Sequence, residues 1–462
     1  MSSSTSQDFP SNTLHLLVLV HGMWGNPTHL AEMERIVKEV RPELHVLLAE
    51  TNKDDSTYDG IDWGGERVAQ EILQEIAHLR SQGKRVREFS ITGYSLGGLV
   101  SRYVAGILAQ RGMFSPDSPD FIIPVNFNTI ATPHLGLVKY TSLFSAISHK
   151  FGPKLLSRTG EQFYCVDKWG KSERPLIDVM SDPSLVFFQA LAQFKYVRIY
   201  ANAVNDLTVP YVTAAIETED PFTEYETNGL ELEFLPEHHP ILSSYSLPSS
   251  LPPKSKSNFL SSSWFRSHKS ASTSAASSSV TISVPSESVD NKRITQKAPI
   301  LPPFLEFRFP VNILVYASIP ILVPSVLTLA VVRLSLASRS SKARITLLEK
   351  EDKSGQQSLA QALFDLERQV EGAVADLIDD SDPSTAIPML HRSAHPILSP
   401  LQKTICARLN SISHLQKERA FIGGLRNTHS TIISREPKVW DKNGVGLGVL
   451  RHWAGSLQLV VV

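Results

Sequence analysis

The stretch Gly93-Tyr94-Ser95-Leu96-Gly97 most strongly constrains how this 462-residue chain can fold. It follows residues 87–92, which are typical of a short strand, and precedes apolar residues at helical spacing over 99–108. A serine at such a strand-to-helix turn needs glycines on both sides, because the backbone is strained and the two elements approach closely. The pattern predicts a nucleophilic Ser95, with the N–H of Leu96 directed toward a developing oxyanion.

The apolar run from Leu14 to Val20 is typical of a strand buried on both faces of a sheet. It ends in the turn His21-Gly22-Met23-Trp24-Gly25, which is where folds with a serine elbow place their second oxyanion donor. We therefore expect the N–H of Met23 to act together with that of Leu96. Strand and helix patterns then alternate as far as residue 130, which favours a parallel sheet with right-handed crossovers.

The acid that would orient a catalytic histidine is expected just after a late strand. Residues 196–200 predict that strand, and Asp206 follows it. Asp178 and Asp182 are alternatives, although Asp182 precedes Pro183 and an Asx turn explains it without catalysis. Asp206 is the predicted acid, which would fix the histidine tautomer and stabilise the imidazolium.

The base must follow the acid, because the chain order in such folds is Ser, Asp, His. The histidines after Asp206 are His238, His239, His268, His391, His395, His414, His429 and His452. We favour His429, which comes in a turn after residues 418–425, a segment that can be the last strand. His452 stays open as the alternative, although its apolar neighbours indicate a packed helix. His134 precedes any plausible acid, so we expect it to have a supporting or turn role.

Composition bounds the other classes of function. The chain has 45 Lys and Arg against 46 Asp and Glu, a net charge of −1, which gives no overall attraction to nucleic acid. Its two cysteines, Cys165 and Cys406, cannot form a disulfide framework, and no Cys/His cluster predicts a zinc site. We expect neither a metal nor an organic cofactor. Residues 1–12 are polar and Ser-rich, so we expect them to be disordered and to carry no secretion signal.

Five motifs together resemble a known family. They are His21-Gly22-Met23-Trp24-Gly25, Asp59-Gly60-Ile61-Asp62, Gly93-Tyr94-Ser95-Leu96-Gly97-Gly98, Ala131-Thr132-Pro133-His134-Leu135-Gly136 and Asn205-Asp206. This set resembles the serine esterase, lipase-like family of fungi and plants, and within it the fungal lipid-droplet phospholipase branch. The likeness covers about residues 14–210 and resumes near His429. It implies an α/β-hydrolase that cleaves acyl esters of glycerolipids, with Ser95, Asp206 and His429 as its triad.

A long insert separates the predicted acid from the predicted base. Residues 241–300 are largely Ser- and Pro-rich and predict a flexible linker. Residues 311–332 contain no charged side chain and as one helix would match the thickness of a bilayer core. One crossing would separate base from nucleophile, and Pro320 and Pro324 interrupt helical hydrogen bonding. We therefore predict a hairpin that enters and leaves a lipid surface by the same face. A buried helix or a pair of strands is the alternative.

The predicted fold is an α/β-hydrolase with a mostly parallel central sheet and a long, partly disordered insert. Its parts are the first core segment 13–240 with a cap candidate at 140–194, the linker 241–300, the insert 301–390 with an amphipathic helix at 357–378, and the completing segment 391–462. The predicted function is hydrolysis of glycerolipid or phospholipid esters at the cytoplasmic face of a membrane or lipid droplet. Alternatives are a soluble carboxylesterase or acyl-protein thioesterase, and a non-catalytic adaptor with a hydrolase fold.

Overall fold

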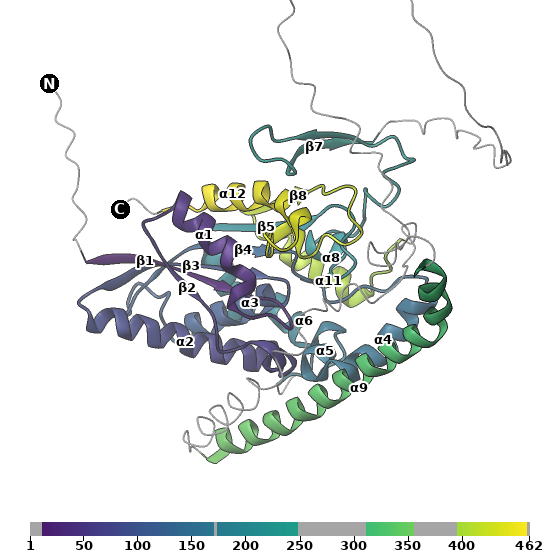
Figure 1. The fold of residues 1–462 in the computed structure, drawn as a ribbon. Coiled ribbons are helices and arrows are strands. Elements are labelled where there is room, and N and C mark those ends of the chain that lie inside the picture. Colours follow the sequence, from purple (N-terminus) through teal and green to yellow (C-terminus); the bar gives the residue numbers. More distant parts are fainter. Residues whose placement is uncertain (1–11, 171–172, 248–310, 355–394, 460–462) are drawn as a thin grey trace, which may run out of the picture.

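The computed structural model describes residues 12–170, 173–247, 311–354 and 395–459. Its centre is a six-stranded, fully parallel sheet in the order β2-β1-β3-β4-β5-β8 (Figure 1). The strands are β1 (Thr13–Val20), β2 (Leu44–Leu48), β3 (Arg85–Tyr94), β4 (Ile123–Ile130), β5 (Tyr196–Asn202) and β8 (Leu415–Ala420). The predicted parallel sheet is therefore confirmed, although its last strand ends before the predicted segment 418–425 does.

Strand order reverses direction between β1 and β3, because the chain first moves from β1 to β2 and then returns to the other side of β1. Open α/β sheets bind their ligands beyond the carboxyl ends of the strands at such a reversal. The turn that begins at His21 follows β1, and Ser95 follows β3. Both candidate motifs thus lie at the point of the sheet where a ligand site is expected.

Both faces of the sheet are covered by helices, as the apolar run in β1 indicates. Leu17 and Leu19 pack with α1 (Ala31–Val40) and α12 (Leu447–Ser456), whereas the alternate residues Leu16 and Val18 face the opposite layer. That layer contains α2 (Ile61–Ser81), α3 (Leu96–Gln110), α7 (Val186–Gln193) and α11 (Pro400–Leu409). The core is therefore two apolar layers separated by one sheet.

Further helical elements complete the described part of the fold. They are η1 (Pro27–Leu30), η2 (Asp54–Tyr58), α4 (Leu143–Leu155), α5 (Ser157–Phe163), α6 (Leu176–Ser181), α8 (Tyr211–Ala214), η7 (Thr431–Ile433) and η8 (Asp441–Gly446). Within the cap candidate 140–194, α6 and α7 pack on α3 with buried Leu176 and Phe187. The cap interpretation is wrong for this part, because these apolar side chains fill the core beneath the sheet.

The predicted linker begins later than residue 241. Strand β7 (Leu242–Ser246) pairs antiparallel with β6 (Glu231–Phe234), and Leu242 is buried. A serine-rich strand is stable here because Ser244 and Ser246 lie exposed on the hairpin, where they donate hydrogen bonds to glutamates of β6. Residues 248–300 of the linker, the amphipathic helix at 357–378 and residues 1–11 lie outside the described residues.

The insert segment 311–332 is not a hairpin. It forms the first half of one 44-residue helix, α9 (Val311–Ser354), which changes direction near its start but does not reverse (Figure 1). A proline inside a helix removes one hydrogen bond and bends the helix without ending it. The second half of α9 packs on the core, so the helix continues beyond the two prolines. Ser325 and Thr328 donate to carbonyls one turn back, a bond that also favours bending. Among the residues that the structure describes, no helix combines the length and the apolar character needed to cross a bilayer.

Candidate active site

Ser95 lies at a sharp turn between β3 and α3, as the sequence predicts. Its φ of 55° and ψ of −124° are strained for a residue with a Cβ atom. A Cβ on Gly93 would lie 2.3 Å from the carbonyl oxygen of Gly97, and one on Gly97 would lie 2.2 Å from that of Val20. The flanking glycines are thus required by the close approach of strand, turn and helix, and they leave Ser95 at the N-terminus of α3.

The turn after β1 lies against this serine. A Cβ on Gly22 would be 2.8 Å from Ser95 Cβ and 3.4 Å from its Oγ. Met23, the predicted second oxyanion donor, follows Gly22 directly, and Leu96 is the first residue of α3. The structure therefore brings the two predicted donor segments to the same side chain. Burial lowers the pKa of neighbouring His21 to about 4, so this imidazole stays neutral beside the site.

Asp206 follows β5, and its side chain is buried, with 1% exposed. Its Oδ1 accepts the backbone N–H groups of Thr208 at 3.0 Å and Val209 at 2.8 Å. Its Oδ2 accepts the side-chain amide of Asn202 at 2.8 Å. These three donors hold the carboxylate in one orientation, with Oδ2 directed toward the loop that follows β8.

That loop carries His429, which joins the other two residues. Nδ1 of His429 lies 3.0 Å from Asp206 Oδ2, and Nε2 lies 3.0 Å from Ser95 Oγ. Since Nδ1–H donates to the carboxylate, Nε2 is the acceptor that faces the serine hydroxyl. Residues separated by more than 330 positions in the chain thus form a continuous hydrogen-bonded row from carboxylate to hydroxyl.

Tyr94 and Asn427 support the position of His429. The Tyr94 hydroxyl donates to the backbone oxygen of His429 at 3.0 Å, and the two rings lie 5.1 Å apart. The N–H of His429 donates to the side chain of Asn427 at 3.3 Å. Sequence reasoning did not assign these two roles or that of Asn202. Tyr94 stands beside Ser95 in the glycine motif, but its partner comes from a distant loop and gives no local signal.

The alternative histidines lie elsewhere. His452 accompanies Tyr200, whose hydroxyl is 3.0 Å from its Nδ1, and burial together with Arg198 and His238 lowers the pKa of His452 to about 4. His134 has 3% exposure and pairs with the hydroxyl of Thr129 at 2.8 Å. Burial lowers its pKa far below the usual range. His452 is thus part of the packing of α12, and His134 supports the turn after β4.

The alternative acids form a separate ion-pair cluster. Asp178 pairs with Arg174 at 2.6 Å and with Arg408 at 2.8 Å, which ties α6 to α11. Asp182 accepts both the backbone N–H and the hydroxyl of Ser184, as an Asx turn does. These hydrogen bonds, with one from Arg174, lower the pKa of Asp182 to about 2. Both carboxylates therefore have structural partners away from Ser95.

The parallel sheet, the strained elbow and the hydrogen-bonded row of Ser95, His429 and Asp206 define an α/β-hydrolase. Comparison with known families agrees with this fold. Residues 10–218 match the family described as "Putative serine esterase (DUF676)". The predicted family resemblance is thus confirmed at this level.

Individual relatives are fungal. The chain is 31% identical over 241 residues to a putative lipase of Schizosaccharomyces pombe, an alignment that covers 50% of this chain and 29% of the relative. It is 29% identical over 212 residues to the putative lipase ROG1 of Saccharomyces cerevisiae, an alignment that covers 45% of this chain and 29% of that relative. These alignments thus span under a third of each relative. Among solved structures, carboxyl esterase 2 from the mycorrhizal fungus Tuber melanosporum is 17% identical, with 41% of this chain and 59% of that chain covered and a TM-score of 0.26.

Proposed function

We propose that this protein hydrolyses acyl esters of glycerolipids at a lipid surface, with Ser95 as nucleophile. The geometry that carries the proposal is the 3.0 Å separation of Ser95 Oγ from His429 Nε2 together with the 3.0 Å separation of His429 Nδ1 from Asp206. This arrangement is suited to acyl transfer, because the imidazole can take the serine proton while the carboxylate stabilises the resulting imidazolium.

The chemistry then proceeds in two steps. Ser95 Oγ attacks the ester carbonyl, His429 takes its proton, and the N–H groups of Met23 and Leu96 stabilise the oxyanion. His429 returns the proton to the leaving alcohol, which departs and leaves an acylated serine. Water attacks the acyl group with the same histidine as base, and the fatty acid is released.

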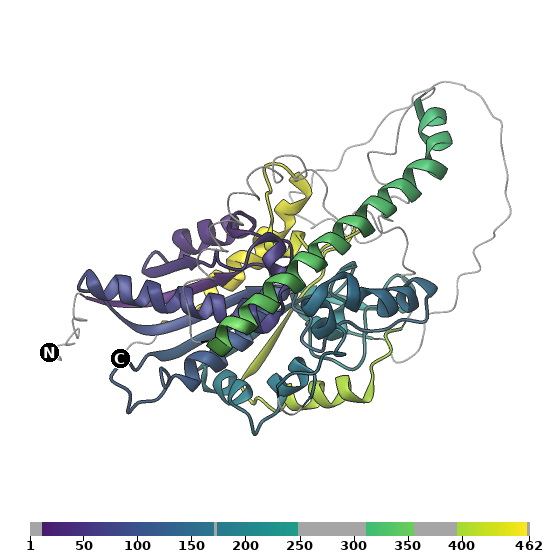
Figure 2. The ribbon, with the colours of Figure 1, turned by 90° about the horizontal axis from the view of Figure 1, so that it is seen from below.

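An exposed apolar stretch of α9 supports a lipid substrate. Its large apolar side chains are between 41% and 74% exposed: Ile321, Leu322, Val326, Leu327, Leu329, Val331, Val332 and Leu336. Helix α4 lies beside α9 (Figure 2). It adds Ile147 and Phe151, which lie four residues apart and are half exposed. Soluble proteins rarely expose an apolar area of this kind without a partner, and a lipid surface would cover it.

Basic residues follow the apolar stretch. Arg333, Arg339 and Lys342 are exposed on α9, where they could contact anionic headgroups while the apolar side chains enter the acyl region. The fungal relatives described as putative lipases support the same substrate class. We therefore favour glycerolipids over the short soluble esters of a carboxylesterase, and the cytoplasmic face of a membrane or lipid droplet as the place of action.

Two experiments test the chemistry. A fluorophosphonate probe should label the wild-type protein and not Ser95→Ala, and lipid extracts incubated with the two proteins should differ in free fatty acid. A folded wild type that does not react with the probe would refute the enzyme and favour the non-catalytic adaptor. Hydrolysis of p-nitrophenyl butyrate or of an acylated peptide, without hydrolysis of any glycerolipid, would replace the proposed substrate class.

A surface variant tests the lipid contact. Ile321→Gln, Leu327→Gln and Leu329→Gln together keep helix-forming side chains and remove apolar area from α9. Binding to phosphatidylcholine and phosphatidylserine vesicles should fall about tenfold or more, while the rate on soluble p-nitrophenyl butyrate stays unchanged. Val439→Gln, which alters an equally exposed apolar residue elsewhere, is the matched control. Equal vesicle binding by the triple variant and this control would reject α9 as the lipid contact.

A further inference from the structure

Helix α9 is joined to the hydrolase core by a face of buried residues, most of which are small. Ala337, Ser341 and Ile345 follow one another at four-residue spacing and are buried, and so is Ser338. Ser341 Oγ accepts a hydrogen bond from Ser157 Oγ at 3.1 Å, and Ser338 Oγ donates to the carbonyl of Lys154 at 2.9 Å. The second half of α9 thus packs closely on α4 and α5, although the insert lies far from both in sequence.

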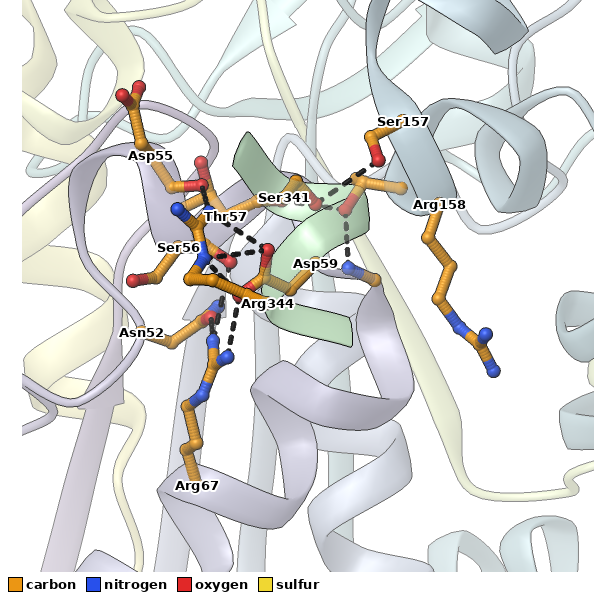
Figure 3. Close-up of polar contacts among 12 residues, drawn as sticks. Asn52, Asp55, Ser56, Thr57, Asp59, Arg67, Ser157, Arg158, Ser341 and Arg344 are labelled. Atoms are coloured by element: carbon orange, nitrogen blue, oxygen red, sulfur yellow. Dashed lines mark hydrogen bonds and ion pairs between the residues drawn. The ribbon is translucent and has the colours of Figure 1, made fainter. Parts of the chain in front are cut away.

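Beside this face, two guanidinium groups converge on one buried carboxylate (Figure 3). Asp59, whose side chain is fully buried, pairs with Arg67 of α2 at 2.5 Å and with Arg344 of α9 at 2.9 Å. Arg344 also donates to the backbone oxygen of Asp55 at 2.8 Å. A charge-assisted pair of low exposure is stronger than a surface ion pair. Arg344 therefore joins α9 to both ends of η2.

Helix η2 forms hydrogen bonds with the turn after β1, which carries Met23. The backbone N–H of Trp24 donates to Thr57 Oγ1 at 3.1 Å, and its indole N–H donates to the hydroxyl of Tyr58 at 2.8 Å. The N–H of Asp54 donates to the carbonyl of Gly25 at 2.9 Å. Trp24 has a φ of 54°, a conformation that a non-glycine residue keeps only when its surroundings enforce it. The residue after the predicted oxyanion donor is thus fixed by η2.

We propose that Arg344 is a positioning residue for the oxyanion turn, acting from the insert through η2. The inference rests on the proposed function, since it concerns the same reaction. Arg344 anchors Asp55 and Asp59, these residues hold η2, and η2 holds Trp24 so that the N–H of Met23 points at the substrate oxygen. An oxyanion donor must be placed before the reaction to be effective, and a turn that moves freely loses that benefit. The insert therefore completes the catalytic site of a domain whose nucleophile lies about 250 residues earlier in the chain.

The test compares Arg344→Gln with Arg111→Gln, a matched loss of one positive charge at an exposed position after α3. Active-site titration with the fluorophosphonate gives the concentration of competent sites, and the rate on p-nitrophenyl butyrate is then expressed per site. We expect kcat of Arg344→Gln to fall about tenfold with KM changed less than about twofold, because the lost interaction acts in the transition state. Arg111→Gln should match the wild type. Asp59 keeps its partner Arg67 in both variants, which favours folding.

Two further variants separate positioning from a merely structural role. Arg344→Lys can restore the charge beside Asp59 but not the second bond to Asp55, so its kcat should lie between those of the wild type and Arg344→Gln. Thr57→Val removes the hydroxyl that accepts the backbone N–H of Trp24, which is the contact between η2 and the turn after β1. In the Thr57→Val background, Arg344→Gln should lower kcat by less than about twofold, because both changes release the same turn.

Three outcomes are decisive. Equal per-site kcat for Arg344→Gln and Arg111→Gln would overturn the inference and leave the proposed function intact. Fewer titratable sites at unchanged per-site kcat would show a structural role only and would also overturn it. A wild type that neither labels nor hydrolyses any ester would remove the proposed function, and the inference with it. If Arg344→Gln does not fold, Arg344→Lys and Thr57→Val decide by the same per-site kcat.

Discussion

Replacing Asp206 by asparagine tests the catalytic arrangement atom by atom. Oδ1 of Asp206 accepts the N–H groups of Thr208 and Val209, so the asparagine oxygen must occupy that position. The new NH2 group then falls at the Oδ2 position, 3.0 Å from His429 Nδ1 and 2.8 Å from the Nδ2 donor of Asn202. Because an NH2 group can only donate, His429 must accept at Nδ1 and carry its proton on Nε2.

An imidazole protonated on Nε2 cannot take the proton of Ser95. Loss of the base with the oxyanion donors intact is expected to lower kcat about 10⁴-fold, which raises the activation barrier by about 5 kcal/mol. Asn202→Ala is the matched control, since it removes one neutral donor to Oδ2 and leaves the tautomer of His429 unchanged. Its expected cost is about 1 kcal/mol, or roughly a fivefold lower kcat.

The assay is hydrolysis of p-nitrophenyl butyrate at pH 7 to 8, with thermal unfolding of each variant to establish that it is folded. Asp206→Asn that keeps more than about a tenth of the wild-type kcat at unchanged thermal stability would refute the reasoning, because the tautomer argument requires near-complete loss. An equal loss from Asn202→Ala would refute it as well, since the effect would then come from disturbing the loop after β5.

Three further outcomes are expected. Trp453→Ala should lower the free energy of unfolding by about 3–5 kcal/mol in urea titrations, because this side chain is fully buried and donates to Thr92; a loss under about 1 kcal/mol would contradict the packing. His452→Gln should keep kcat within about threefold of the wild type while His429→Gln loses about 10⁴-fold, and the reverse order would exchange their roles. Burial raises the pKa of Asp220 from 3.8 to about 6, so the folded state binds this proton more tightly than the unfolded chain does. Stability from this group is full below about pH 4 and is lost as the pH rises through 6, by at most about 3 kcal/mol; Asp220→Asn should remove that slope from unfolding curves measured between pH 4 and 7.

The elbow and the buried strand before the oxyanion turn could be predicted because their signals are local. Gly93 and Gly97 are required by contacts within the turn and with β1, and an apolar run without alternation indicates a strand that is covered on both faces. The choice of Asp206 also followed from its place after a strand. Each of these features depends mainly on neighbouring residues, so the sequence carries it directly.

The conformation of the insert could not be predicted from local signals of this kind. Hydropathy and two prolines predicted a hairpin at 311–332, but α9 continues because residues 337–345 dock on α4, α5 and η2. Nothing near Arg344 in the sequence indicates that its partner is Asp59. Ser-rich composition likewise predicted a linker at residues 242–246, where pairing with β6 makes a strand.

The sequence by itself determined the parallel sheet and predicted the candidate nucleophile and the order of acid and base, since these depend on periodicity, turn chemistry and chain order. Only the tertiary structure decided that His429 rather than His452 faces Ser95, and that Arg344 of the insert pairs with Asp59. The physical reason is the short range of the interactions that form the site. A hydrogen bond acts over about 3 Å, and residues more than 200 positions apart come that close only after the whole chain has packed.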